Sequence, residues 1–175
     1  FISGGAPLAK KMAYFFNNAG ISILEGYGLT ESSAATCVNR PDLNKIGSVG
    51  KPLPGTDVRI ADDGEILIKG PGVMREYYKR PEATAEVLVG DGWLATGDIG
   101  VIDSDGYVRI TDRKKDLIVT AGGKNVAPQN IENAIKASNP LISQVVIHGD
   151  KRKYLVALLT LEPESAARLG AQHGI

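Results

Sequence analysis

Six consecutive residues, Gly26, Tyr27, Gly28, Leu29, Thr30 and Glu31, bring together more chemistry than any other stretch of the chain. The glycines allow backbone to approach a ligand closely, the tyrosine offers an aromatic face, and Thr30 and Glu31 add a hydroxyl and a carboxylate. This mixture suits a nucleotide bound with a metal ion. On its own, a Gly-x-Gly pattern is weak evidence, and an ordinary turn is the simpler interpretation.

The elements around this stretch indicate where it lies. The apolar residues 21–24 predict a short buried strand, so residues 26–31 are expected as a loop at its carboxyl end. Residues 7–19 have the apolar spacing of an amphipathic helix, and residues 1–3 resemble a strand. Two strands joined through a helix are expected to be parallel, which brings Gly4 and Gly5 to the same sheet edge.

The middle of the chain predicts antiparallel structure. Residues 39–56 are rich in proline and glycine and are interpreted as a connecting segment. Alternating apolar residues on both sides of Asp62-Asp63-Gly64 predict one hairpin, and residues 99–110 predict a second. Residues 81–89 predict a short helix. Residues 50–111 are therefore expected to form a small antiparallel sheet or barrel.

The last third of the chain begins with five consecutive charged residues, 112–116, which are interpreted as a linker. Gly122 and Gly123 then interrupt a short apolar run, and Pro128 opens a helix that ends near Asn139. Strands are predicted over residues 144–148 and 154–161, joined by a basic turn, and a helix follows Pro163. This order of elements is typical of an α+β domain.

Composition narrows the classes of partner. The 175 residues include 20 basic and 20 acidic side chains, so the net charge gives no argument for a nucleic-acid partner. Cys37 is the single cysteine, which fits the cytoplasm, and no apolar run is long enough to span a membrane. The chain starts with Phe1-Ile2-Ser3, without a methionine or a charged leader, and we therefore expect a fragment of a longer polypeptide.

Four stretches, in order and spacing, resemble the motifs of the AMP-dependent synthetases, or adenylate-forming enzymes: residues 3–8, 26–31, 92–98 and 106–116. The charged run followed by Gly122, Gly123 and Pro128 is most similar to the C-terminal portion of bacterial long-chain fatty-acid CoA ligases. The resemblance covers essentially the whole chain. It implies an α/β and α+β fold: the edge of a parallel αβ sheet (residues 1–49), a small antiparallel β-barrel subdomain (50–111), a hinge (112–116) and a truncated, mobile α+β lid domain (117–175).

The resemblance also implies a reaction. The carboxylate of a long-chain fatty acid attacks the α-phosphate of ATP to give acyl-adenylate and pyrophosphate, and the thiol of coenzyme A then displaces AMP. Charge neutralisation by Mg2+ and hydrogen-bond donors would assist the first step. Fatty acid, ATP and coenzyme A are the implied partners, with no nucleic acid and no transmembrane segment. The resemblance leaves room for peripheral membrane contact by the full-length protein.

Residue roles follow only from the family pattern. Backbone at Gly5 and Ala6 would line the adenine, Tyr27 between Gly26 and Gly28 would stack on it, and Thr30 would bind the α-phosphate. Glu31 would help to hold Mg2+, and Asp98 would accept hydrogen bonds from the ribose hydroxyls. In the charged run, Arg113 would contact ribose or phosphate and Lys115 would be the hinge. Gly122 and Gly123 would face the pantetheine channel.

Two family features have no counterpart in this chain: the Ser/Thr/Gly-rich phosphate loop and the lysine near the C-terminus that assists adenylation. We therefore expect the fragment alone to be inefficient in the first half-reaction. Two alternatives stay open: an adenylation domain that delivers its acyl group to a carrier protein, and a non-catalytic nucleotide-binding module. The basic turn at Lys151, Arg152 and Lys153 is most simply a solvated hairpin tip.

Overall fold

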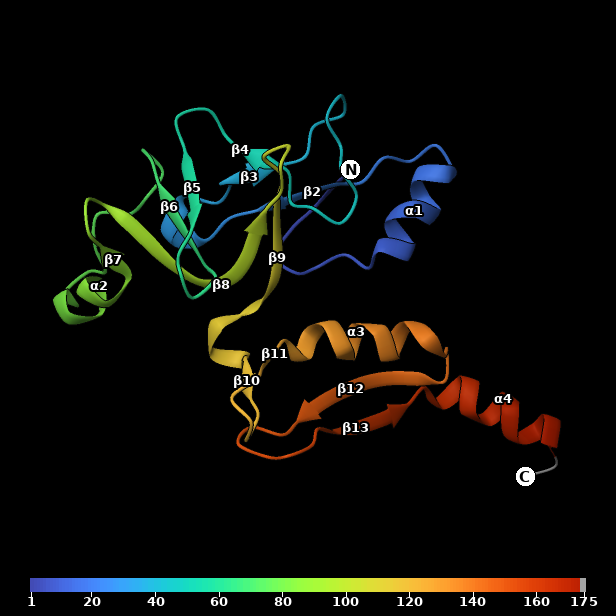
Figure 1. Ribbon diagram of the computed structural model, residues 1–175. Coiled ribbons are helices and arrows are strands. Elements are labelled where there is room, and N and C mark those ends of the chain that lie inside the picture. The colour runs from blue at the N-terminus through green and yellow to red at the C-terminus, as the bar shows by residue number, and fades with distance from the viewer. Residues whose placement is uncertain (174–175) are drawn as a thin grey trace. The chain divides into compact units, whose positions relative to one another are not determined.

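The computed structural model describes residues 1–173, and the chain divides into two compact units, residues 1–110 and the part that starts at residue 111 (Figure 1). The first unit holds two sheets and the second holds two hairpins with helices. No helix in the described part of the chain is both long and apolar enough to cross a membrane.

The first unit opens with the predicted strand, helix and strand: β1 (Ile2–Ser3), α1 (Lys10–Asn18) and β2 (Leu24–Tyr27). β1 and β2 are parallel, as predicted, and the structure places Ser3 opposite Glu25. β2 lies three residues later than residues 21–24, so the expectation that the whole of residues 26–31 forms a loop is wrong. Gly26 and Tyr27 pair with the following strand instead, and this pairing extends β2.

Two further strands make this sheet mixed rather than purely parallel. β3 (Cys37–Val38) and β4 (Lys51–Pro52) continue it in antiparallel order, β1-β2-β3-β4. The interpretation of residues 39–56 as connection only is therefore wrong at β4. Pro52 is tolerated because β4 is the last strand of the sheet, where a missing N–H breaks no ladder.

The second sheet of this unit contains both predicted hairpins. It runs in the order β5 (Asp57–Ile60), β6 (Glu65–Lys69), β8 (Trp93–Ile102) and β7 (Leu88–Val89), with β9 (Val108–Arg113) also paired to β8. α2 (Pro81–Val87) precedes β7. The order of these described strands is open, so the subdomain is the antiparallel sheet that the residue pattern allowed and not the barrel that the resemblance implied.

A shared core fixes the two sheets together. Its buried side chains come from both: Tyr27 and Cys37 from the first sheet, and Ile66, Ile68, Leu94 and Val108 from the second. Burial raises the pKa of the Cys37 thiol to about 12, which keeps it neutral. Cys37 thus behaves as a small apolar residue of the core.

The second unit is a small α+β structure. After β9, the 3-10 turn η2 (Lys114–Asp116) leads to the hairpin β10 (Ile118–Val119) and β11 (Asn125–Val126). The charged run is thus strand and turn rather than an irregular linker. Then follow α3 (Pro128–Ser138), the hairpin β12 (Ile142–His148) and β13 (Val156–Leu161), and α4 (Pro163–His173). The core of the unit is Ile118, Val145 and Ile147, packed against Ile131 and Ile135 of α3.

Candidate nucleotide site

Tyr27 and Asp98 are in direct contact, although 71 residues separate them in sequence. The Tyr27 hydroxyl donates a hydrogen bond of 2.7 Å to Asp98 Oδ2. Both residues are buried, with 8% and 3% of their surfaces exposed. A buried carboxylate is costly without hydrogen-bond donors, and Tyr27 supplies one. Burial first, and then the hydrogen bond to Asp98 and the charge of Asp98, raise the pKa of Tyr27, so its hydroxyl remains a donor.

The local geometry of β8 aims Asp98 toward Tyr27. Pairing between β6 and β8 shifts register near Glu65, and Gly97 takes a positive φ of 72° in the same region. The Gly97 N–H donates to Glu65 Oε1 at 2.7 Å, and the Asp98 N–H donates to Thr96 Oγ1 at 3.1 Å. This bulge re-aims a side chain within a strand, which is a known use of such irregularities.

The glycines of the motif differ in what they do. A Cβ on Gly28 would lie 1.4 Å from the carbonyl oxygen of Ala34, so Gly28 is required by the chain's own backbone. A Cβ on Gly26 would make only ordinary contacts, the nearest at 3.5 Å, and one on Gly5 would meet nothing within 4 Å. Gly5 therefore has open space beside it, whereas Gly26 borders the β3 residues Cys37 and Val38, and Gly4 lies next to Gly26 across the parallel pair.

Thr30 and Glu31 lie on a short 3-10 turn, η1 (Thr30–Ser32), directly after β2. Two hydrogen bonds hold this turn in place: Ser32 Oγ accepts from the Leu29 N–H at 3.0 Å and from Thr36 Oγ1 at 2.9 Å. Thr30 is exposed, and its hydroxyl makes no hydrogen bond within residues 1–173. A rigid base thus presents a free hydroxyl and a carboxylate.

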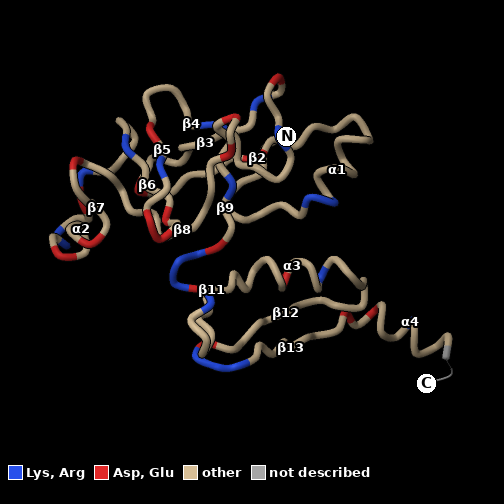
Figure 2. Tube along the Cα trace, viewed as in Figure 1, with Lys and Arg blue, Asp and Glu red and all other residues tan. Residues whose placement is uncertain are grey.

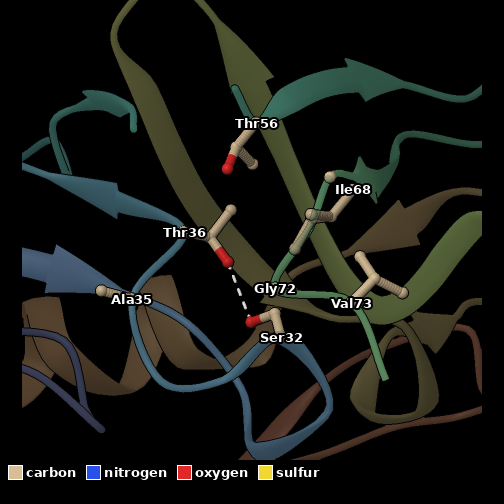
Figure 3. A pocket seen from close by; sticks show the side chains of 8 residues that line it. Ser32, Ala35, Thr36, Thr56, Ile68, Gly72 and Val73 are labelled. Atoms are coloured by element: carbon tan, nitrogen blue, oxygen red, sulfur yellow. Dashed lines mark hydrogen bonds between the residues drawn. The ribbon is translucent and has the colours of Figure 1, made fainter. Parts of the chain in front are cut away.

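The small cavity beneath η1 is not the ligand site. Figure 3 shows its lining, with Thr36 and Ser32 hydrogen-bonded to each other beside Thr56, Ile68 and Val73. Its volume is about 20 Å³, which suits roughly one water molecule rather than a nucleotide.

Glu31 has a partner that the sequence did not reveal. The Tyr77 hydroxyl donates to Glu31 Oε1 at 2.7 Å, across 46 residues of sequence. No group of three or more His, Cys, Asp or Glu within the described residues could hold a metal ion alone. A Mg2+ ion at Glu31 would therefore need phosphate oxygens and water as its other ligands, which is the usual mode for this ion.

The remaining predicted site residues lie in the second unit. Arg113 ends β9, Lys115 is in the middle of η2, and both side chains are exposed. Gly122 and Gly123 form the exposed turn between β10 and β11, and a Cβ on either would meet nothing within 4 Å. In Figure 2 the Lys and Arg positions, in blue, cluster along the charged run and at the turn between β12 and β13.

Asp112, which carried no role in the sequence analysis, is among the most buried residues of the chain, with 1% exposed. Its Oδ1 accepts from the Arg113 N–H at 2.6 Å, whereas its Oδ2 has no hydrogen-bond partner among the residues that the structure describes. Burial raises the pKa of Asp112, and the backbone N–H groups of Arg113 and Gln129 partly oppose this shift. Gln129 lies in the first turn of α3, so Asp112 faces a helix N-terminus.

Comparison with known proteins matches two family models to the chain. The model described as "AMP-binding enzyme" matches residues 1–78, and that described as "AMP-binding enzyme C-terminal domain" matches residues 115–173. The long-chain-fatty-acid CoA ligase FadD15 of Mycobacterium tuberculosis is 49% identical over 164 residues, which are 94% of this chain and 27% of that ligase. The chain thus spans about a quarter of the length of such relatives.

Solved structures agree with these matches. The o-succinylbenzoate CoA synthetase (MenE) of Bacillus subtilis in complex with the acyl-adenylate intermediate OSB-AMP superposes with a TM-score of 0.83 at 32% identity, covering 97% of this chain and 38% of that one. The same enzyme in complex with ATP and magnesium ion gives 0.80 at 33% identity, over 92% of this chain and 36% of that one. By its family models, relatives and fold, the chain belongs to the AMP-binding, adenylate-forming enzymes.

Proposed function

We propose that this chain contributes the nucleotide-binding edge and hinge region of a long-chain fatty-acid CoA ligase. In the first half-reaction a fatty-acid carboxylate oxygen bonds to the α-phosphorus of ATP, and pyrophosphate leaves. In the second, the coenzyme A sulfur bonds to the acyl carbon, the thiol loses its proton, and AMP leaves. The convergence of Tyr27 and Asp98 in one place, within a chain whose relatives carry that name, is the observation that supports this proposal.

The first unit would bind the nucleotide. Asp98 would accept hydrogen bonds from the ribose hydroxyls, because hydrogen bonds to a charged carboxylate are stronger than those between neutral groups. Tyr27 would present its ring to the adenine while its hydroxyl stays on Asp98. The open space beside Gly5 leaves its backbone available to the base, and the backbone of Ala6 and Gly26 would lie alongside it.

The exposed turn η1 would receive the phosphates. The free hydroxyl of Thr30 would donate to the α-phosphate, and Glu31 would help to hold Mg2+. The ion, when bound, neutralises charge on the phosphates and so favours attack by a carboxylate that is itself negative. A relative of this chain has been solved with ATP and magnesium ion, which supports this choice of metal.

The second unit would serve the thiol step. Arg113 would add a positive charge near ribose or phosphate, and Lys115 would provide the backbone pivot between two poses of the C-terminal domain. Gly122 and Gly123, exposed and without side chains, would let the thin pantetheine arm pass close to backbone. We propose residues 1–49 as the end of the nucleotide-binding subdomain, 50–111 as the small β subdomain, 112–116 as the hinge and 117–175 as the C-terminal lid domain.

The single, buried Cys37 fits action in the cytoplasm.

The test is an assay of the full-length protein that carries this chain. With a long-chain fatty acid, ATP, Mg2+ and coenzyme A, we expect equal amounts of AMP and acyl-CoA, and pyrophosphate release that requires the fatty acid. A parallel reaction with a carrier protein in place of coenzyme A separates the two acceptors. Binding of ATP without any acyl product in either reaction would contradict the ligase and favour the non-catalytic module.

A further inference from the structure

The Tyr77 hydroxyl reaches Glu31 from the loop between β6 and α2. It donates to Glu31 Oε1 at 2.7 Å, while Glu31 Oε2 makes no hydrogen bond within residues 1–173. One carboxylate oxygen is thus fixed by the protein, and the other is left available. A carboxylate that binds a hard cation through one oxygen commonly has its other oxygen held in this way by a neighbouring donor.

The segment that carries Tyr77 is itself anchored at both of its ends. The Tyr77 N–H donates to Thr84 Oγ1 at 2.9 Å, and that hydroxyl donates to the Arg80 carbonyl at 2.8 Å. On the other side, the Met74 N–H donates to the Glu31 backbone carbonyl at 2.7 Å. The same segment therefore holds both the main chain and the side chain of Glu31.

A second contact ties this segment to η1. Ser33 Oγ donates to the Gly72 carbonyl at 2.8 Å, and a Cβ on Gly72 would lie only 2.9 Å from the Ser32 carbonyl oxygen. The packing is too close for the segment to slide along the turn. Without Tyr77, the Glu31 side chain would be free to sample several rotamers, and a bound cation would have to order it.

We propose that Tyr77 is a positioning residue, which orients the Glu31 carboxylate toward the divalent cation of a bound nucleotide. This inference rests on the proposed function of Glu31. Tyr78 offers a matched control, because it is the next residue, has the same side chain and is 81% exposed.

The test compares Tyr77→Phe with Tyr78→Phe in the full-length protein. Mn2+ is the probe, and its binding is measured by electron paramagnetic resonance in the presence of a non-hydrolysable ATP analogue. Loss of a partner in this outer position typically weakens metal binding about 10-fold or more. We expect that loss in Tyr77→Phe and no change in Tyr78→Phe, with equal affinity of both variants for the analogue when metal is chelated.

A double-mutant cycle separates positioning from a general structural effect. In a Glu31→Gln background, Tyr77→Phe should weaken Mn2+ binding no further, because the two side chains act as one unit. Equal Mn2+ affinity of Tyr77→Phe and the wild type would overturn the inference while the ligase assignment stood. If Tyr77→Phe weakened Mn2+ binding as much in the Glu31→Gln background as in the wild type, the inference would be overturned as well. A wild-type protein that binds the analogue no better with Mn2+ than without it would overturn the metal role of Glu31 itself.

Discussion

At the scale of single residues, the candidate site depends on two carboxylates that are each held by a tyrosine. Asp98 accepts from Tyr27, and Glu31 accepts from Tyr77, both at 2.7 Å. The two differ in burial, since Asp98 is 3% exposed and Glu31 is only half-buried. A buried carboxylate suits neutral hydroxyl donors, whereas a more accessible one suits a hydrated cation.

Asp98→Asn tests the ribose contact. The amide oxygen can still accept from Tyr27, so the fold should be kept, but the charge that strengthens hydrogen bonds to ribose is lost. Hydrogen bonds to charged groups contribute about 1.5–3 kcal/mol, so ATP affinity should fall about 10-fold or more. Isothermal titration calorimetry of the full-length protein with ATP and Mg2+ measures this affinity.

The matched control is Asp103→Asn, in the turn between β8 and β9. Asp103 forms an ion pair with Lys45 at 2.7 Å on the surface, where such pairs contribute little. Its loss should leave ATP affinity unchanged. Similar affinity of Asp98→Asn and the wild type would remove Asp98 from the nucleotide site.

At the scale of elements, the chain from β2 to η1 is shaped by one very close backbone approach. Gly28→Ala should destabilise the first unit by about 3 kcal/mol, because the new methyl group would overlap the Ala34 carbonyl. Gly26→Ala should leave stability nearly unchanged, because its Cβ finds ordinary contacts. Urea denaturation of both variants measures this difference.

The same pair of variants separates folding from binding. If Gly26 leaves room for adenine, Gly26→Ala should weaken ATP binding in a protein of wild-type stability. Stability losses of equal size in the two variants would contradict the close approach at Gly28.

Asp112 gives the second unit a dependence on pH. Burial raises its pKa in the folded state, so the folded protein holds this proton to higher pH than the unfolded chain does. Its contribution to stability is therefore greatest below the ordinary aspartate pKa and is lost as pH rises through the raised value. Asp112→Asn, which mimics the neutral acid, should be more stabilising near pH 7 than at low pH.

Urea denaturation from about pH 3 to pH 7 measures this difference between variant and wild type. Asp62→Asn is the control, because Asp62 lies exposed in the turn between β5 and β6. Its effect should not vary with pH in the same way. If the difference in stability between Asp112→Asn and the wild type did not change with pH, this carboxyl would titrate alike in the folded and unfolded chains.

At the scale of the whole molecule, the division into two compact units falls between Ile110 and Thr111. Lys115 lies just beyond it, in the short turn η2. A 3-10 turn is held by few hydrogen bonds, so a change of two backbone dihedrals there would cost less than in a strand or a long helix. This agrees with the proposed pivot.

Lys115→Pro should restrict that pivot, because proline fixes φ and disfavours helical backbone in the preceding residue. In the full-length protein we expect one half-reaction to be kept and the other to be strongly reduced. Pyrophosphate release measures adenylation, and thioester formation from pre-formed acyl-adenylate measures transfer. Equal loss of both, at unchanged melting temperature, would count against the hinge.

Local patterns in the sequence determined much of the fold. Apolar alternation around Asp62-Asp63-Gly64 gave the β5–β6 hairpin, and the run opened by Pro128 gave α3, because periodicity and breakers act over neighbouring residues. The resemblance of four motifs assigned Tyr27 and Asp98 to one nucleotide site. The later start of β2 and the strand β4 were missed, because both depend on pairing with distant strands.

The sequence by itself determined which residue types could serve a nucleotide, and the order of most elements. Only the tertiary structure decided that the β8 bulge aims Asp98 at the Tyr27 hydroxyl, that Gly28 serves the Ala34 backbone, and that Tyr77 holds Glu31. The physical reason is separation along the chain. Hydrogen bonds across 46 and 71 residues, and the burial that makes them strong, arise only when two sheets pack on a common core.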